Sequence, residues 1–238
     1  MRIGEDFDKI EFEVFGLELL EPNAFIGDLL VFIVAIILAF KVSKMNRNEP
    51  FFKYWRLFFI VFGVGFLFGG FGHLFYNYWG VQGKTPAWYL GLISTLLVEK
   101  AMISIHPSEK FRSTFNIVAY VKFCLALAAA LYVSFFIDLA ADYTVGLKVP
   151  TINTSVGLII TIGYFCYLFI KKIAGFWFFL LGLLTLIPVA VIQSMKLNLH
   201  QLMDRNDISH VLLIIAIICY YFGVKSYAEY KIGKEASA

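Results

Sequence analysis

The chain has 238 residues, of which 60% are hydrophobic and only 16% are charged, with a formal net charge of +3. Its mean hydropathy of +0.78 excludes a soluble domain, which needs more polar surface to face water. The apolar residues fall into runs of about 18 or more, the length that spans a bilayer. No basic patch with interleaved aromatic residues is present, so we expect no nucleic-acid partner.

The first 23 residues are acidic and precede the first apolar run. Between residues 7 and 14 apolar and charged side chains alternate with a period of two. This alternation predicts either a short strand or a segment that lies on the membrane surface. We therefore expect an N-terminal segment at 1–23, a transmembrane domain at 24–228 and a cytoplasmic tail at 229–238.

Seven apolar runs make up the transmembrane domain. Because every backbone polar group inside a bilayer must be hydrogen-bonded within the protein, runs of this length are helices. The fold class that we predict is an all-α bundle of seven transmembrane helices. The predicted spans are 24–43, 54–79, 86–106, 113–137, 151–171, 174–195 and 207–228.

The orientation follows from the positions of Lys and Arg. With the N-terminus outside, the inner loops hold about twice as many Lys and Arg residues as the outer loops. We therefore expect the N-terminus outside and the C-terminus in the cytoplasm. The composition favours an integral protein of a bacterial inner membrane.

Two histidines are predicted to lie near the outer ends of their spans. His73 lies in the second span and His210 in the seventh, with Asn206 one helical turn before His210 and His200 in the preceding loop. Ionisable groups inside a membrane are costly, so they indicate a functional site. The alternative for either histidine is a hydrogen bond to a neighbouring helix at the interface.

A second pair of ionisable residues is predicted nearer the inner side. Glu99 lies about two-thirds of the way through the third span, and Lys122 lies in the fourth. The two side chains form either a structural ion pair between adjacent helices or the lining of an inner cavity.

Four oxygen-bearing side chains are close together in sequence around the start of the first span. They are Glu18, Glu21, Asn23 and Asp28. Such hard ligands are typical of a calcium site. The alternative is solvated charge, with Asn23 capping the helix.

The second span is rich in glycine. Small residues at a spacing of four, such as Gly65 and Gly69, allow close helix packing. Alternatively, Gly69 and Gly70 make room for a ligand or an acyl chain.

The placement of the histidines resembles the seven-helix hydrolase superfamily (CREST) that includes alkaline ceramidases and adiponectin-receptor-type proteins. Its helix-two pattern Ser-x-x-x-His corresponds here to residues 69–73, with Gly69 at the serine position. Its helix-seven pattern His-x-x-x-His corresponds to residues 206–210, with Asn206 at the first histidine. The chain is also similar to uncharacterised bacterial seven-helix proteins. The stretch from Glu18 to Asn23 is similar to the calcium-binding stretch of the alkaline ceramidases.

The resemblance implies a candidate zinc site and a candidate calcium site. The zinc candidates are His73, His210, Asn206 and His200, and the calcium candidates are Glu18, Glu21, Asn23 and Asp28. The predicted third span, at 86–106, contains no aspartate to match the catalytic aspartate of the superfamily. With the serine and one histidine also replaced, this chain departs from the family's catalytic set, and its catalytic residues are unknown.

Two functions follow from these observations. The first is a non-catalytic seven-helix protein that binds membrane lipids, or that serves as a subunit of a larger complex with protein partners. The alternative is a zinc-dependent amidase that acts on a membrane lipid at the outer leaflet. Retinal is excluded as a cofactor, because the seventh span has Lys225 only at its inner end and lacks a central lysine for a Schiff base.

Overall fold

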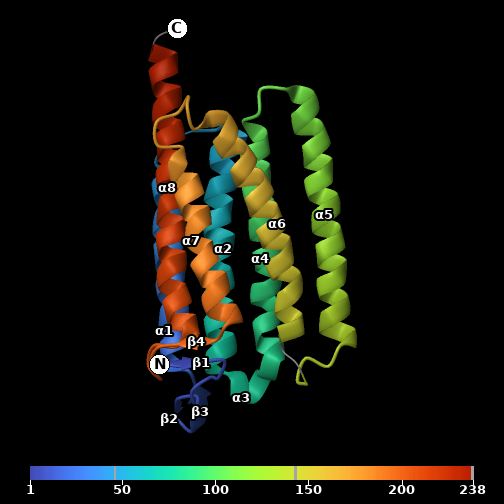
Figure 1. Cartoon of the computed structure of the whole chain (residues 1–238), viewed down its shortest axis with the longest axis vertical. Helices are drawn as coiled ribbons and strands as arrows, with labels where there is room; N and C mark the ends of the chain where they lie inside the picture. Colours follow the sequence, from blue (N-terminus) through green and yellow to red (C-terminus); the bar gives the residue numbers. More distant parts are fainter. Residues whose placement is uncertain (46, 142–143, 237–238) are drawn as a thin grey trace.

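The computed structural model describes residues 1–45, 47–141 and 144–236 (Figure 1). Within these residues, seven helical segments are long and apolar enough to cross a membrane. The prediction of an all-α, integral membrane protein with seven such helices is confirmed. The helices are α1 (Pro22–Ser43), α2 (Pro50–Leu74), α4 (Thr85–Ser104), α5 (Glu109–Phe136), α6 (Thr144–Phe169), α7 (Trp177–Ser194) and α8 (Arg205–Ala236).

The acidic N-terminal segment forms strands. β2 (Glu11–Val14) and β3 (Leu17–Leu20) pair as an antiparallel hairpin at one end of the bundle, so of the two alternatives for the period-two alternation the strand is confirmed. β1 (Arg2–Ile3) pairs with β4 (Leu197–Asn198), which lies between α7 and α8. The N-terminus is therefore held beside the loop that leads into α8.

Several predicted boundaries differ from the observed helix ends, and α6, for example, begins at Thr144 rather than at residue 151. The second span was expected to reach residue 79, but α2 ends at Leu74 and the chain turns through α3 (Tyr76–Trp79) and the 3-10 helix η1 (Gly80–Lys84). Gly80 has a φ of +54°, which glycine adopts at little cost, and it ends α3. The seventh span was expected to end at residue 228, but α8 continues to Ala236, and no proline interrupts it.

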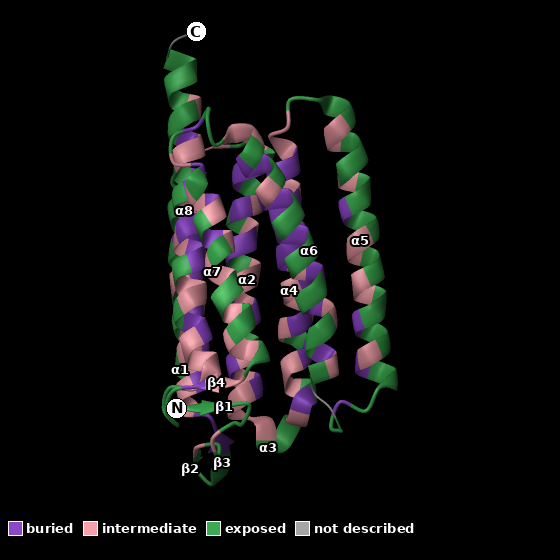
Figure 2. Ribbon diagram, in the orientation of Figure 1, coloured by how far each residue is buried: buried purple, intermediate pink, exposed green. Residues whose placement is uncertain are grey.

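The helices do not contribute equally to the core. α1 packs against α2 and α8, α2 packs against α4, and α7 packs against α8. The core is rich in aromatic rings, among them Trp55, which is fully buried and stacks on Phe179 with ring centroids 5.1 Å apart. α5 lies at the edge, where it contacts α4 and α6 (Figure 1). Exposed residues cover most of α5 and the outer faces of the other helices (Figure 2).

Candidate functional site

A group of buried and half-buried ionisable side chains lies at the end of the bundle that carries the β2–β3 hairpin. We call it the N-terminal polar cluster, and it consists of Lys9, Glu21, Asp28, His73, Lys84 and His210. Its members come from the N-terminal segment, α1, α2, η1 and α8. Lys84 is close enough to Glu21 and to Asp28 to interact electrostatically with both carboxylates. The cluster therefore joins elements that are far apart in the sequence.

Asp28 and His210 form a buried pair between α1 and α8. The Oδ1 atom of Asp28 lies 3.0 Å from Nε2 of His210, and the two residues are only 3% and 7% exposed. The other nitrogen of the ring, Nδ1, faces Gly27, where a Cβ atom would overlap the imidazole. The pair thus depends on a small residue at position 27, and it fixes the distance between the two helices.

His73 and Glu21 form the second buried pair. With its proton on Nδ1, His73 donates to Oε2 of Glu21 across 2.8 Å, and Lys9 donates to the same oxygen, also across 2.8 Å. Lys84 Nζ lies 3.3 Å from His73 Nδ1. Burial alone would raise the pKa of Glu21, but His73 and Lys9 lower it further than burial raises it, so Glu21 stays ionised well below the usual range.

Glu21 also holds a strained backbone conformation. Its φ of +49° and ψ of +55° are left-handed, and it immediately precedes Pro22 at the start of α1. Its backbone N–H donates to the carbonyl of Ile10, across 2.9 Å. A left-handed conformation costs a non-glycine residue about 1–3 kcal/mol and persists only where its surroundings enforce it. The contacts with His73, Lys9 and Ile10 are the surroundings that enforce it here.

The start of α8 explains the residues before His210. The Asp204 carboxylate accepts bonds from the backbone N–H groups of Asn206 and Asp207, and the Asp207 carboxylate accepts the N–H of Asp204. This reciprocal arrangement is a capping box, which satisfies the free N–H groups of the first helical turn. Burial, followed by the nearby charge of Asp207, raises the pKa of Asp204.

The structure does not bring the four candidate zinc ligands to one point. Asn206 accepts a bond from Gln193 across 3.3 Å, and His200 is exposed, with its Nδ1 accepting the backbone N–H of Leu202. His210 offers one nitrogen to Asp28 and the other faces Gly27. Among the described residues, no group of three or more His, Cys, Asp or Glu side chains is arranged to hold a metal ion.

The four candidate calcium ligands likewise have separate partners. Asn23 donates to Asp207 across 2.8 Å, whereas Glu21 binds His73 and Asp28 binds His210. Glu18 is exposed. Asn23 therefore does not cap its own helix but ties the start of α1 to the start of α8.

Gly69 and Gly70 face α1. A Cβ atom at Gly70 would lie 3.0 Å from Cβ of Asp28 and 3.1 Å from the Phe25 ring, and one at Gly69 would lie 3.7 Å from an Asp28 oxygen. Of the two alternatives for these glycines, the geometry matches close helix packing, because α1 itself occupies the space beside them.

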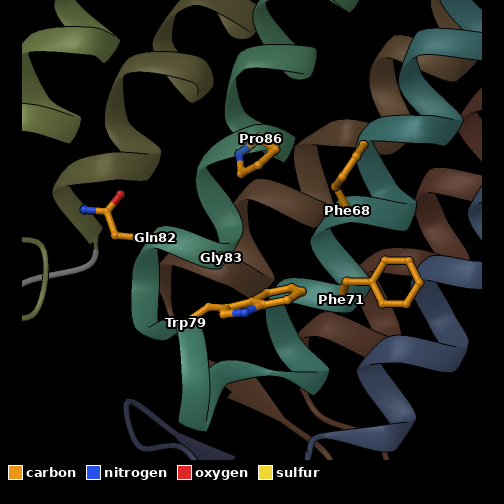
Figure 3. Close-up of a pocket in the computed structure, with 6 residues that line it drawn as sticks. All are labelled: Phe68, Phe71, Trp79, Gln82, Gly83 and Pro86. Carbon is orange, nitrogen blue, oxygen red and sulfur yellow. The ribbon is translucent and has the colours of Figure 1, made fainter.

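An apolar groove lies beside the polar cluster, on the surface formed by α2, α3, η1 and α4 (Figure 3). Its volume is about 470 Å³. Phe68 and Trp79 on its walls are 45% and 50% exposed. The one polar side chain in the lining is Gln82, whose Oε1 accepts the Thr85 hydroxyl across 3.1 Å. The lining residues are Phe68, Phe71, Trp79, Gln82, Gly83 and Pro86.

Glu99 and Lys122 are close together, between α4 and α5. Their nearest side-chain atoms are 3.2 Å apart, and Lys122 also donates to Asn153 Oδ1 of α6 across 2.6 Å. Glu99 is 5% exposed. This geometry is that of the structural ion pair considered from the sequence, and it attaches the peripheral helix α5 to its two neighbours.

Lys9 and Lys84 are the members of the cluster that the sequence patterns did not single out. Lys9 looked like one charge among many in an acidic segment. Lys84 lies eleven residues after His73, and the chain reverses direction between them, so that the two side chains meet. A short turn after the second span is the sequence signal that could have indicated this contact. The groove has no comparable signal, since its walls come from two helices and a turn.

Residues 24–229 match DUF6962, a family of unknown function. The match extends from the start of α1 almost to the end of α8 and covers most of the chain. The chain therefore belongs to this family. No curated protein and no solved structure matches the chain.

Proposed function

We propose that this member of the DUF6962 family is a non-catalytic seven-helix membrane protein that binds a membrane lipid, with an acyl chain in the groove beside η1. The observation that carries the proposal is the groove itself. It is about 470 Å³ in volume, and three of its six lining residues are aromatic. A concave, largely apolar site with one polar group is typical of small-molecule binding.

The position of the groove favours a lipid as its occupant. It opens on the surface of α2 and α4, two of the membrane-spanning segments, where the surrounding medium is acyl chain. Trp79 and the neighbouring Tyr78 are about half exposed, as aromatic residues at a membrane–water interface commonly are. The amide of Gln82 lies at the same end, where its Oε1 accepts the Thr85 hydroxyl across 3.1 Å and its Nε2 donates to the Ser134 carbonyl across 3.5 Å.

The polar cluster supports a structural role behind the groove rather than catalysis. A catalytic zinc needs three good protein ligands and an open position for water. His210 gives one nitrogen to Asp28 and turns the other toward Gly27, and Gly69 stands where the hydrolases that the chain resembles have serine. The carboxylate partners of His73 and His210 instead fix α1 against α2 and α8.

The proposal includes an orientation and a location. We place the chain in a bacterial inner membrane, with the N-terminal polar cluster on the outer side and the C-terminus in the cytoplasm. Lys and Arg residues are about twice as frequent in the loops that this orientation puts inside. The groove then faces the outer leaflet.

Quenching of tryptophan fluorescence by a brominated lipid tests the groove. Of the four tryptophans, Trp55 and Trp88 are buried, whereas Trp79 and Trp177 are about half exposed. In the full-length Trp177→Phe variant, titration in detergent with brominated-chain phosphatidylcholine is expected to quench Trp79 saturably, at one lipid per chain. In the Trp79→Phe variant, Trp177 is expected to show only gradual quenching without saturation.

Substitutions of two exposed phenylalanines provide the control. Phe68→Ala removes one wall of the groove and is expected to weaken the saturable quenching, whereas Phe115→Ala removes an exposed ring of α5 that does not line the groove and is expected to leave it unchanged. Identical quenching in both variants would contradict the proposal. The zinc amidase would replace the proposed function under two conditions. The purified protein would release fatty acid from an N-acyl lipid and hold one zinc per chain, and His73→Ala would lose both the activity and the zinc.

A further inference from the structure

A second groove lies at the opposite end of the bundle, between the end of α1 and the second half of α8. Its volume is about 250 Å³. Three lysines contribute to its lining, Lys41, Lys44 and Lys225, together with the aromatic ring of Tyr221 and the carboxylate of Glu229. The groove is therefore basic, in contrast to the apolar groove beside η1.

The basic side chains beside this groove have carboxylate partners, whereas Lys41 and Lys44, which line the groove, do not have one among the described residues. Arg47 bonds to Glu235 across 2.8 Å, and Lys231 lies 3.7 Å from Glu49. Their charges are thus used in contacts between the α1–α2 connection and α8. Lys225 has one weak partner, Glu229 at 3.7 Å, and both side chains are at least half exposed.

Lys41 and Lys44 contact aromatic rings instead. Within the part of the chain that the structure describes, no carboxylate oxygen lies within 4.0 Å of either ammonium group. The Lys41 Nζ atom lies 5.6 Å from the centre of the Tyr221 ring on α8, and Lys44 Nζ lies 4.5 Å from that of Phe40. The groove therefore keeps an excess of positive charge.

An apolar stripe leads along α1 to the same lysines. Ile33, Ile37 and Phe40 are 42%, 49% and 59% exposed. With Lys44 they are spaced by four, three and four residues, so all four lie on one face of the helix. An acyl chain that packs along this stripe would leave its polar end beside Lys44.

We propose that this basic groove binds the phosphate headgroup of an anionic phospholipid whose acyl chains lie along the exposed face of α1. Lysine is a strong point charge for phosphate, and its long stem lets the ammonium reach the headgroup from apolar surface. Basic pockets between transmembrane helices bind such headgroups in this way. The stripe of apolar side chains favours a lipid over free phosphate, which needs no apolar surface.

Native mass spectrometry of the full-length protein in neutral detergent tests the proposal. Phosphatidylglycerol and phosphatidylcholine with identical acyl chains are added at equal concentrations, with inorganic phosphate as a competitor. We expect phosphatidylglycerol to be retained in preference to phosphatidylcholine. The triple variant Lys41→Gln/Lys44→Gln/Lys225→Gln is expected to retain less phosphatidylglycerol. Each of its three substitutions should weaken the binding of this lipid about fivefold.

The matched control is Lys171→Gln/Lys172→Gln, which removes two exposed lysines from the loop between α6 and α7, at the same end of the bundle. Its retention of phosphatidylglycerol is expected to equal that of the unmodified protein. Equal losses in both variants, or no loss in the triple variant, would overturn the site. Displacement of the lipid by inorganic phosphate would overturn its assignment to a lipid.

The thermal unfolding midpoint of each variant checks that the variant is folded. If the triple variant is not folded, the lipid binding of the single variant Lys44→Gln is measured instead. The result is independent of the groove beside η1, because the two grooves lie at opposite ends and share no residue.

Discussion

Both ends of the bundle contain pairs of oppositely charged side chains, but the pairs are buried at one end and lie at the surface at the other. At the N-terminal end, Asp28 and His210 are almost fully buried and contact each other across 3.0 Å. At the C-terminal end, the Arg47–Glu235 contact is at the surface, and Glu235 is 57% exposed. A buried charge that loses its partner keeps its desolvation cost, whereas an exposed one is solvated by water. The N-terminal charges should therefore determine stability, and the C-terminal ones should remain free for ligands.

The largest expected effect is from Asp28→Ala. Removal of the carboxylate leaves His210 buried without a partner and should lower the free energy of unfolding by about 3–5 kcal/mol. Unfolding by SDS in mixed micelles measures this change. The double variant Asp28→Leu/His210→Leu should recover much of the loss, since two apolar side chains leave no polar group unpaired. A double variant as unstable as the single one would show that the pair is not the cause.

A somewhat smaller effect is expected for Lys122→Met. The variant leaves Glu99 without its cation between α4 and α5, where the 26% exposure of the Lys122 side chain makes the pair less enclosed than Asp28 and His210. We expect a loss of about 2–4 kcal/mol, measured in the same way. Adding Glu99→Gln should restore most of it, because the neutral amide carries no charge to be desolvated. A lack of restoration would indicate that Lys122 acts mainly through Asn153.

Glu21→Gln should cost about 1.5–3 kcal/mol, the contribution of hydrogen bonds to a charged group. It should also change the dependence of stability on pH. The pKa of Glu21 is lower in the folded protein than its ordinary value of 4.5. Its contribution is therefore fully present above about pH 4.5 and is lost as the pH falls below that value.

The thermal unfolding midpoint, recorded between about pH 3 and pH 7, tests this contribution. The unmodified protein should lose stability more steeply than Glu21→Gln on the acidic side of this range. The exposed Glu18→Gln variant is the matched control and should follow the unmodified protein. Parallel curves for the protein and Glu21→Gln would contradict the role of the Glu21 charge.

The smallest effect is expected for Arg47→Ala. The residue contacts Glu235 and Glu49 at the surface, where an ion pair contributes little and is screened by salt. The thermal unfolding midpoint in detergent should stay within measurement error of that of the unmodified protein at moderate ionic strength. A decrease as large as that for Asp28→Ala would remove the contrast between the two ends.

The helices were predictable because a bilayer leaves few choices. Runs of about 18 apolar residues must form helices there, and all seven predicted spans lie on observed helices. The boundaries were less predictable. Apolar residues continue past Leu74 although the helix ends there, and charged residues follow residue 228 although α8 continues to Ala236. Hydropathy indicates whether a segment lies in an apolar medium, but it does not indicate the residue at which the helical backbone hydrogen bonds end.

The site was predictable in its residues but not in its pairings. The polarity of His73, His210, Glu21 and Asp28 within or beside apolar runs was visible in the sequence. The resemblance assigned them to two metal sites, whereas in the structure Asp28 meets His210 and Glu21 meets His73. Asp204 and Asp207, three residues apart, form the cap of α8.

The sequence by itself determined the number of helices long and apolar enough to span a membrane, the period-two alternation of the N-terminal segment and the polar residues that needed partners. These properties depend on local periodicity and on the cost of polar groups in an apolar medium. Only the tertiary structure decided that Asp28 meets His210, that Glu21 meets His73 and that two grooves lie at opposite ends of the bundle. Each of these features depends on the distance between helices, which is set by side chains from several elements packed together.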